Sequence, residues 1–203
     1  MRGVTDRPSS AEETLDLRDA ALFVRLEGCL VARDGDGGRG ASCLGSLLAL
    51  LEGATRGATV LLTDRPASAL RGRISPIPQC VLSSTGAAGH AARLPASRDA
   101  SSTVVPDQGR PSDAILYPGL VRDLHGQCRR LSDDLAGGCG SLRAARSADA
   151  IGTLLHHPAL SGRAPVLIGA AARDAAALER IDRMGGVAIA VGSGLAQVPR
   201  RLR

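Results

Sequence analysis

Short apolar runs alternate with segments of helical periodicity along this chain, and that alternation constrains the fold more than any other feature. The runs occupy residues 21–31, 58–63, 79–84, 165–170 and 187–192. Short and nearly continuous apolar runs are typical of strands that are buried on both faces of a parallel sheet. We therefore predict five strands, most of them parallel.

Leucine, isoleucine and alanine at helical spacing fill the intervals between these runs. They predict helices over residues 43–51, 66–74, 148–160 and 173–186. Parallel strands require such long connections. We expect an α/β fold of the Rossmann-like type, in which a mainly parallel sheet is flanked by helices. Its ligand crevice should lie beyond the C-terminal ends of the strands, where Arg25, Thr63 and Gly169 are predicted to meet.

The composition limits which residues can form the core and which catalytic or binding groups the chain can offer. Only Phe23 and Tyr117 are aromatic, so the core must consist of alanine, leucine, valine and isoleucine. All 25 basic residues are arginine, which excludes any mechanism that requires a lysine ammonium group. The net charge of +5 comes from scattered arginines and one basic tail, residues 199–203. Because aromatic stacking platforms are nearly absent, we do not expect specific nucleic-acid binding.

No targeting or membrane signal is evident. No apolar run approaches the ~20 residues that a membrane span needs, and residues 1–19 form a polar, flexible leader without an apolar signal core. The five cysteines are an odd number without CxxC spacing, which favours free thiols in a reducing compartment. We therefore predict a cytoplasmic protein that does not enter a membrane.

The composition also divides the chain. Residues 20–84 and 142–198 carry the elements of the predicted core. Between them, residues 85–141 are rich in Gly, Ser, Pro, Asp and Arg and have one apolar cluster, at 114–121. We predict that this range is a partly irregular or disordered insertion.

Three stretches together resemble a known family. They are LFVRLEGCLV (22–31), ATVLLTDRP (58–66) and HPALSGRAPVLIGAAARDAAALERIDRMGGVAIAVGSG (157–194). Their order and spacing, over about 110 residues, are similar to those of trehalose-6-phosphate phosphatases in the haloacid dehalogenase-like (HAD) superfamily. The resemblance implies a HAD-type core, and it makes the insertion at 85–141 a shortened cap.

The resemblance also implies where the family's catalytic residues would fall. Arg25 stands in place of the aspartate nucleophile, and a guanidinium has no lone pair to offer. Glu27 stands in place of the second aspartate, the general acid and base. Thr63 keeps the phosphate-contacting hydroxyl. Ser147 stands where the family has a cationic residue.

The family's metal site is degenerate in this chain. Its acidic pair would fall at Ala170 and Ala171, and neither can bind magnesium. Asp174 matches an acidic residue of the family's next motif, but a lone carboxylate is a weak magnesium ligand. No cofactor is therefore expected, although the family uses Mg²⁺.

Three functions follow as hypotheses. The first is an inactive or strongly impaired phosphatase-like protein that binds a phosphosugar or another anion through Arg25 and Thr63, or that binds a protein partner. The second is a phosphatase with non-standard residues, in which Glu27 or Asp174 is the base. The third is an NAD(P)-type dinucleotide-binding protein that uses the glycine loop Gly35–Gly40, with Asp64 at the end of the next strand.

Other motifs are weaker. His156 and His157 are adjacent on a predicted helix and therefore point in different directions, unlike an i, i+4 metal pair. His125, Cys128 and Cys139 could supply three zinc ligands, but no fourth ligand has matching spacing. The neighbouring serines Ser83 and Ser84 have no nucleophile-elbow context.

Overall fold

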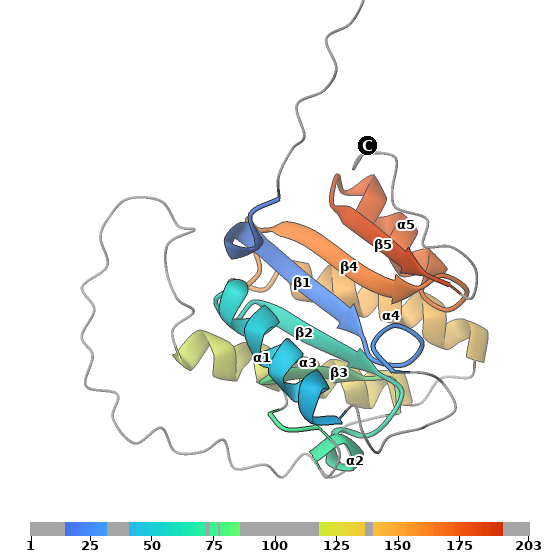
Figure 1. The fold of residues 1–203 in the computed structure, drawn as a ribbon. Coiled ribbons are helices and arrows are strands. Elements are labelled where there is room, and N and C mark those ends of the chain that lie inside the picture. Colours follow the sequence, from blue (N-terminus) through green and yellow to red (C-terminus); the bar gives the residue numbers. More distant parts are fainter. Residues whose placement is uncertain are drawn as a thin grey trace, which may run out of the picture.

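Five parallel strands form a single sheet. In this computed structural model, the described residues are 15–31, 41–71, 74–76, 78–85, 118–136 and 140–192. The strands are β1 (Ala20–Arg25), β2 (Thr59–Thr63), β3 (Cys80–Ser83), β4 (Ala164–Ala170) and β5 (Val187–Val191). Their order is β3-β2-β1-β4-β5, and every neighbouring pair is parallel. The predicted α/β, Rossmann-like class is confirmed (Figure 1).

Helices lie on both sides of the sheet. They are α1 (Ala41–Ala54), α2 (Ala67–Arg71), α3 (Pro118–Ala136), α4 (Gly140–Leu155) and α5 (Ala175–Arg183), and a 3-10 turn, η1 (Leu17–Asp19), precedes β1. In Figure 1, α1 lies in front of the sheet, α2 lies below its lower edge, and α3 and α4 lie behind it. The buried residues of α5 belong to the same rear cluster as those of α3 and α4.

The core follows from the period-two alternation of strand side chains. In β1, Ala21 and Phe23 face the rear helices, whereas Leu22 and Val24 face the opposite side, where Leu51 of α1 packs against their cluster. All six residues of β1 are buried, as expected for the central strand of a parallel sheet.

The strand order creates a topological switch point between β1 and β4. From β1 the chain proceeds outward through β2 to β3, and it then returns to place β4 on the other side of β1. In open α/β sheets, ligands bind where the order reverses, beyond the C-terminal ends of the strands. Here that crevice lies between Arg25, the last residue of β1, and the loop that follows Ala170 in β4.

Two elements have clearly different bounds in the structure from those predicted. The strand predicted over residues 21–31 ends at Arg25, because residues 26–30 form a tight turn. The helix predicted over 148–160 instead spans Gly140–Leu155. It ends early because Pro158 disfavours the helical conformation at the residue before it.

The prediction that residues 85–141 form a partly irregular insertion is partly wrong. Residues 118–136 form α3, which packs on β3 as part of the rear layer. Four of its side chains are buried in the main core cluster: Val121, Leu124, Cys128 and Leu135. Their spacing of three, four and seven residues is that of one helix face. Polar residues between these positions, and a cysteine among them, conceal the pattern in the sequence.

Several predictions lie outside the described residues. They concern most of the leader, the glycine loop Gly35–Gly40, the range 86–117 and the basic tail 199–203. Within the described ranges, no helix has both the length and the apolar character needed to cross a membrane.

Close packing of α1 gives a first test. A Cβ added at Gly45 would lie 2.0 Å from the carbonyl oxygen of Ser75. We expect Gly45→Ala to lower the free energy of unfolding by about 1–3 kcal/mol, because the methyl group must push the backbones apart. Urea unfolding followed by circular dichroism measures this change.

Gly53→Ala in the same helix is the matched control. Nothing lies within 4 Å of a Cβ at Gly53, so this substitution should stabilise the protein by about 0.5–1 kcal/mol through helix propensity. If Gly45→Ala is equally stabilising, the close approach of α1 to Ser75 is incorrect.

Candidate functional site

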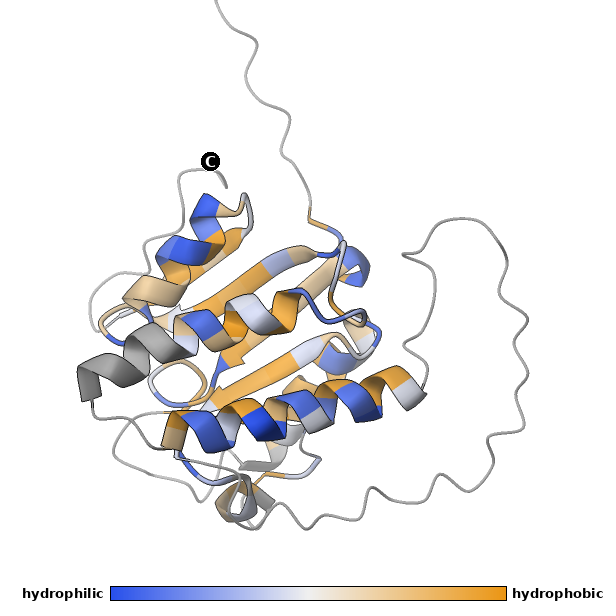
Figure 2. Cartoon of the chain, turned by 180° about the vertical axis from the view of Figure 1, so that it is seen from behind, coloured by the Kyte–Doolittle hydropathy of each residue, from blue (hydrophilic) through white to orange (hydrophobic). Residues whose placement is uncertain are grey.

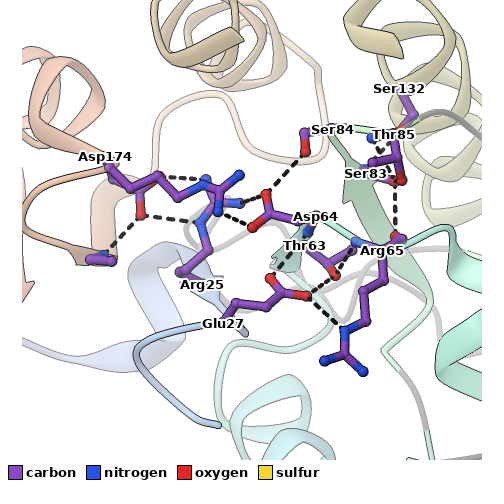
Figure 3. A network of polar contacts seen from close by, with 12 residues as sticks. Arg25, Glu27, Thr63, Asp64, Arg65, Ser83, Ser84, Thr85, Ser132 and Asp174 are labelled. Atoms are coloured by element: carbon purple, nitrogen blue, oxygen red, sulfur yellow. Dashed lines mark hydrogen bonds and ion pairs between the residues drawn. The ribbon is translucent and has the colours of Figure 1, made fainter. Parts of the chain in front are cut away.

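The turn after β1 places two charged side chains at the C-terminal edge of the sheet. Arg25 ends the strand, and Glu27 follows two residues later. The turn closes because the amide of Val31 donates to the carbonyl of Leu26 at 3.0 Å. It also requires a φ of +81° at Gly28, a conformation that favours glycine. Glu27 is thereby directed toward the end of β2, and Arg25 toward the loop after β4 (Figure 3).

Arg25 makes a bidentate ion pair with Asp174, the residue that precedes α5. The Nε of Arg25 donates to Oδ2 at 3.1 Å, and Nη2 donates to Oδ1. The amide of Ala170 also donates to Oδ2, at 2.8 Å. Gly169 leaves room for this carboxylate, because a Cβ there would lie 3.0 Å from the Cβ of Asp174. The two side chains of the ion pair are only 4% and 2% exposed, and they close the crevice at the switch point.

Asp64, directly after β2, extends this ion pair to the other strand ends. Its Oδ1 lies 3.6 Å from Nη1 of Arg25 and accepts a hydrogen bond from Oγ of Ser84 at 3.0 Å. Its Oδ2 is ion-paired with Arg173, which comes from the loop after β4. One carboxylate therefore joins the ends of β1 and β3 to that loop (Figure 3).

Glu27 is buried and closes the junction between β1 and β2. Its Oε1 accepts a hydrogen bond from Oγ1 of Thr63 at 2.7 Å and lies 3.9 Å from Nε of Arg65. Its Oε2 accepts from the amide of Asp64 at 3.1 Å. A buried carboxylate needs such donors, because burial without them is costly.

The charges of this cluster balance. It contains three arginines and three carboxylates: Arg25, Arg65, Arg173, Glu27, Asp64 and Asp174. Burial opposes the charge of Arg25, but hydrogen bonding and attraction to Asp174, with smaller attractions to Asp64 and Glu27, outweigh it and raise the pKa of Arg25. Arg25 thus stays protonated while its charge is neutralised locally. A cluster with no formal net charge attracts neither anions nor cations strongly.

Cys29 lies in the same turn as Glu27. Burial raises the pKa of its thiol to about 11, Asp174 and Glu27 act in the same direction, and Arg25 opposes them. At neutral pH this residue is therefore a thiol, whereas the nucleophilic form of cysteine is the thiolate.

The predicted site residues differ in what they contribute. Arg25, Glu27, Thr63 and Asp174 meet in the cluster through their side chains, and Ala170 takes part only through its amide. Two others do not join these side-chain contacts. Ala171 donates a hydrogen bond from its amide to the carbonyl of Val191 at 2.9 Å, and Ser147 lies within α4.

The two predicted phosphate contacts face the protein's own carboxylates. The guanidinium of Arg25 is held by Asp174 and lies close to Asp64, and the hydroxyl of Thr63 donates to Glu27. In this arrangement their donors are engaged internally. Their role in binding phosphate stays a prediction.

The residues of the cluster do not fit a magnesium ion. Arg25 contacts both Asp174 and Asp64, so a positive charge already lies between the carboxylates that a metal would need. At ~4 Å and an effective dielectric of ~20, repulsion between this charge and a dication would be about 8 kcal/mol. Within the described ranges, no group of three or more His, Cys, Asp or Glu residues is arranged to hold a metal ion.

The three histidines within the described residues make separate contacts, each with its own partner. Nδ1 of His156 bonds the carbonyl of Gly152 at 2.7 Å, whereas Nε2 of His157 bonds Oδ2 of Asp123 at 3.2 Å. Nδ1 of His125 bonds the carbonyl of Gln79 at 2.8 Å.

No contact among the described residues supports the zinc hypothesis or the dinucleotide hypothesis. Cys128 is buried in the rear core, and a hydrogen bond with Cys80 together with burial raises the pKa of its thiol. Cys139 lies outside the described residues, as does the glycine loop. Asp64, the acidic residue of the dinucleotide hypothesis, is ion-paired with Arg25 and Arg173.

Sequence reasoning missed the outer part of the cluster. It gave no role to Arg65 or to Arg173, and it considered Ser84 only as a nucleophile. A signal was present, because Arg65 and Arg173 follow apolar runs by two and three positions, and Ser84 is the last residue of another. Parallel strands bring such positions to one edge of a sheet.

Comparison of the sequence with models of protein families found no match, and comparison with curated proteins found none either. The class of this protein is therefore defined by its structure: a Rossmann-like α/β protein whose switch-point crevice is closed by an internal ion-pair cluster.

The central ion pair gives a second test. Arg25→Met leaves the buried Asp174 without its counter-charge, and we expect a loss of about 3–5 kcal/mol in the free energy of unfolding. Arg65→Met is the control, because its side chain is 33% exposed and 3.9 Å from Glu27. It should cost no more than about 1 kcal/mol. Urea unfolding of both variants measures the difference.

A double substitution separates charge from packing. Arg25→Met combined with Asp174→Leu removes both charges, so we expect it to recover part of the loss. Recovery stays partial because the amide of Ala170 loses its acceptor. Equal effects of Arg25→Met and Arg65→Met would contradict a central role for the ion pair.

Proposed function

We propose that this protein is a non-hydrolytic relative of the HAD phosphatases, of the trehalose-6-phosphate phosphatase type, which acts by binding instead of catalysis. The motif order in the sequence is the basis for the family. The observation that carries the loss of catalysis is the Arg25–Asp174 ion pair. It places a cation in the crevice, where phosphate-ester hydrolysis by this family needs a nucleophile and a metal ion.

Other nucleophiles and bases in the cluster do not replace the missing aspartate. Glu27 and Asp174 both accept hydrogen bonds and ion pairs within the protein, so their lone pairs are engaged. Cys29 is protonated at neutral pH, since its pKa is about 11. Loss of a nucleophile alone can lower a rate by about 10⁶, and this argues against a phosphatase with non-standard residues.

The balance of charges favours a protein partner over a phosphosugar at the buried part of the cluster. An anion would have to displace Asp174 or Asp64 from Arg25, and it would bring a second negative charge beside them. A protein surface needs no such displacement. Because the phosphosugar is disfavoured at this position, we propose a protein partner as the ligand.

A second candidate function rests on the rim of the cluster. The side chains of Arg65 and Arg173 are 33% and 32% exposed, and they follow β2 and β4, the strands on either side of β1. Guanidinium groups of this kind bind phosphate in two-point contacts. A phosphosugar such as trehalose 6-phosphate would then bind at the rim, outside the closed crevice.

Phosphate release tests the main proposal. We expect release from trehalose 6-phosphate and from p-nitrophenyl phosphate to equal the buffer rate, with and without millimolar MgCl₂. Glu27→Gln should behave identically, because no proton transfer depends on this residue. A wild-type rate above buffer that Glu27→Gln abolishes would overturn the proposal and establish an enzyme.

Isothermal titration tests the rim. The second candidate predicts that trehalose 6-phosphate binds at millimolar concentration in low salt, and that Arg65→Ser weakens the binding at least 5-fold through loss of a charge-assisted contact. Unphosphorylated trehalose is the ligand control and should give no heat. Absence of heat with trehalose 6-phosphate removes the phosphosugar and leaves partner binding.

A further inference from the structure

The two faces of the sheet are covered unequally. Behind it, α3, α4 and α5 pack across the strands, and hydrophilic residues run along these helices (Figure 2). In front, Leu44 and Leu48 of α1 pack against β2 and β3, and Leu51 packs against the cluster formed by β1 and β4. Within the described ranges, no helix lies in front of β4 and β5 (Figure 1).

The front face of β4 and β5 is apolar and only partly buried. Ile168 and Val187 pack against the same cluster as Leu51 of α1, which places them on the front face. Ile189 and Val191 follow Val187 at the strand period of two and therefore face the same way. All four side chains are partly exposed, and we call them the apolar shelf. Since both faces of a parallel sheet are normally covered, the shelf lacks one layer.

α1 is apolar on the sides where a surface helix usually carries charge. Leu50 and Leu47 are 72% and 42% exposed, and they are two of the three large apolar side chains that are exposed within the described residues. Glu52 is the one charged residue of the helix, and it accepts a hydrogen bond from the amide of Gln79 at 3.0 Å. A helix that is apolar all round is typical of a buried position. In a single copy, one side of α1 instead faces solvent.

The exposed leucines of α1 lie on the side of the helix that faces the shelf. Leu44 and Leu48 pack over β2 and β3, whereas Leu51 packs toward β1 and β4. Successive helix residues are about 100° apart, so Leu47 and Leu50 lie about 40° and 100° beyond Leu51, on the side away from Leu44 and Leu48. α1 therefore forms an apolar wall beside the apolar shelf.

We propose that the chain forms a two-fold symmetric dimer in which α1 of each copy lies on the apolar shelf of the other. One copy has a helix side without a cover and a sheet face without a helix, and a second copy supplies both at once. The two-fold axis would run parallel to β1 and between the two α1 helices, so that equal residues of the helices meet. This inference does not depend on the proposed function.

Shape and charge both fit a second copy. The side of α1 opposite its buried leucines carries the small residues Ser46, Ala49 and Gly53, which leave room for the branched side chains of the partner's shelf. Neither surface carries a charged side chain. Two copies of a chain with a net charge of +5 can therefore meet here without bringing arginines together.

The available area predicts a weak dimer. α1 has 14 residues, so it is about 21 Å long and about 10 Å wide. Two strands with five paired residues add a face of about 10 by 16 Å. Together these surfaces give roughly 400 Å² of flat area per copy, and projecting side chains increase it. Because a standard interface buries about 800 Å² per partner, we expect a dissociation constant on the order of 10 μM.

Sedimentation velocity of the full chain tests the dimer. We expect reversible association with a dissociation constant on the order of 10 μM, and no weakening in high salt, because the contact is apolar. Leu50→Glu should raise this constant at least about 10-fold, since it would bury an unpaired charge. Met184→Glu is the control, because Met184 is 48% exposed at the end of α5, and it should associate like the parent.

The fold should tolerate Leu50→Glu, because this side chain faces solvent in one copy, and an unchanged circular dichroism spectrum checks this. Val191→Thr tests the shelf with a side chain of the same shape, and it should weaken the dimer at least about 3-fold by burying a hydroxyl group. A chain that stays monomeric at about 1 mM would overturn the proposal. Association of Leu50→Glu equal to that of the parent would also overturn it.

Cross-linking tests the arrangement of the two copies. Since equal residues of the α1 helices meet at the axis, Leu50→Cys in a Cys43→Ser background should be joined to its own copy by a short bismaleimide. Mass spectrometry should then find peptides linked through position 50 of both copies. Met184→Cys in the same background should give no link through position 184. A dimer without a link at position 50 would show that another surface joins the copies, and it would contradict the proposal.

Discussion

The bidentate ion pair between Arg25 and Asp174 is the interaction on which the C-terminal edge of the sheet depends. It joins the central strand β1 to the loop after β4, across the point where the strand order reverses. Asp64 and Arg173 attach to it from the neighbouring loops. In most sheets of this class, the same place is kept open for a ligand. Here, side chains of the protein supply both charges, and the crevice becomes part of the folded core.

This arrangement explains why residue types alone are a poor guide to activity at this site. Glu27 and Asp174 are acids at the expected edge of the sheet, and Thr63 is a hydroxyl at the expected strand end. Each of them is nevertheless engaged by a donor or acceptor of the protein. Chemistry requires groups that are free to contact a substrate, and the pairing of these side chains opposes that.

Much of the fold was predictable because the relevant signals are local. The five apolar runs, bounded by glycine, proline and charged residues, correspond to five strands, and most helices follow from leucine and alanine spacing. α3 was not recognised, since its buried face includes Cys128 and lies among many charged positions. The cluster was predictable only in part. Sequence places Arg25, Thr63 and Asp174 at one edge of the sheet, but pairing between residues 149 positions apart depends on the three-dimensional register of β1 and β4.

The ion pair also restricts how this chain can change. A carboxylate at position 25 would stand beside Asp64 and Asp174. Asp64 would keep Arg173 as its partner, but the buried Asp174 would lose its counter-charge, at a cost of several kcal/mol. That cost is a large fraction of the 5–15 kcal/mol that stabilises a typical domain. A single substitution toward an open acidic site is therefore expected to give a less stable protein, unless another cation replaces the arginine. Arg25 is therefore compatible with the neighbouring carboxylates, and it is difficult to replace by another residue while they are present.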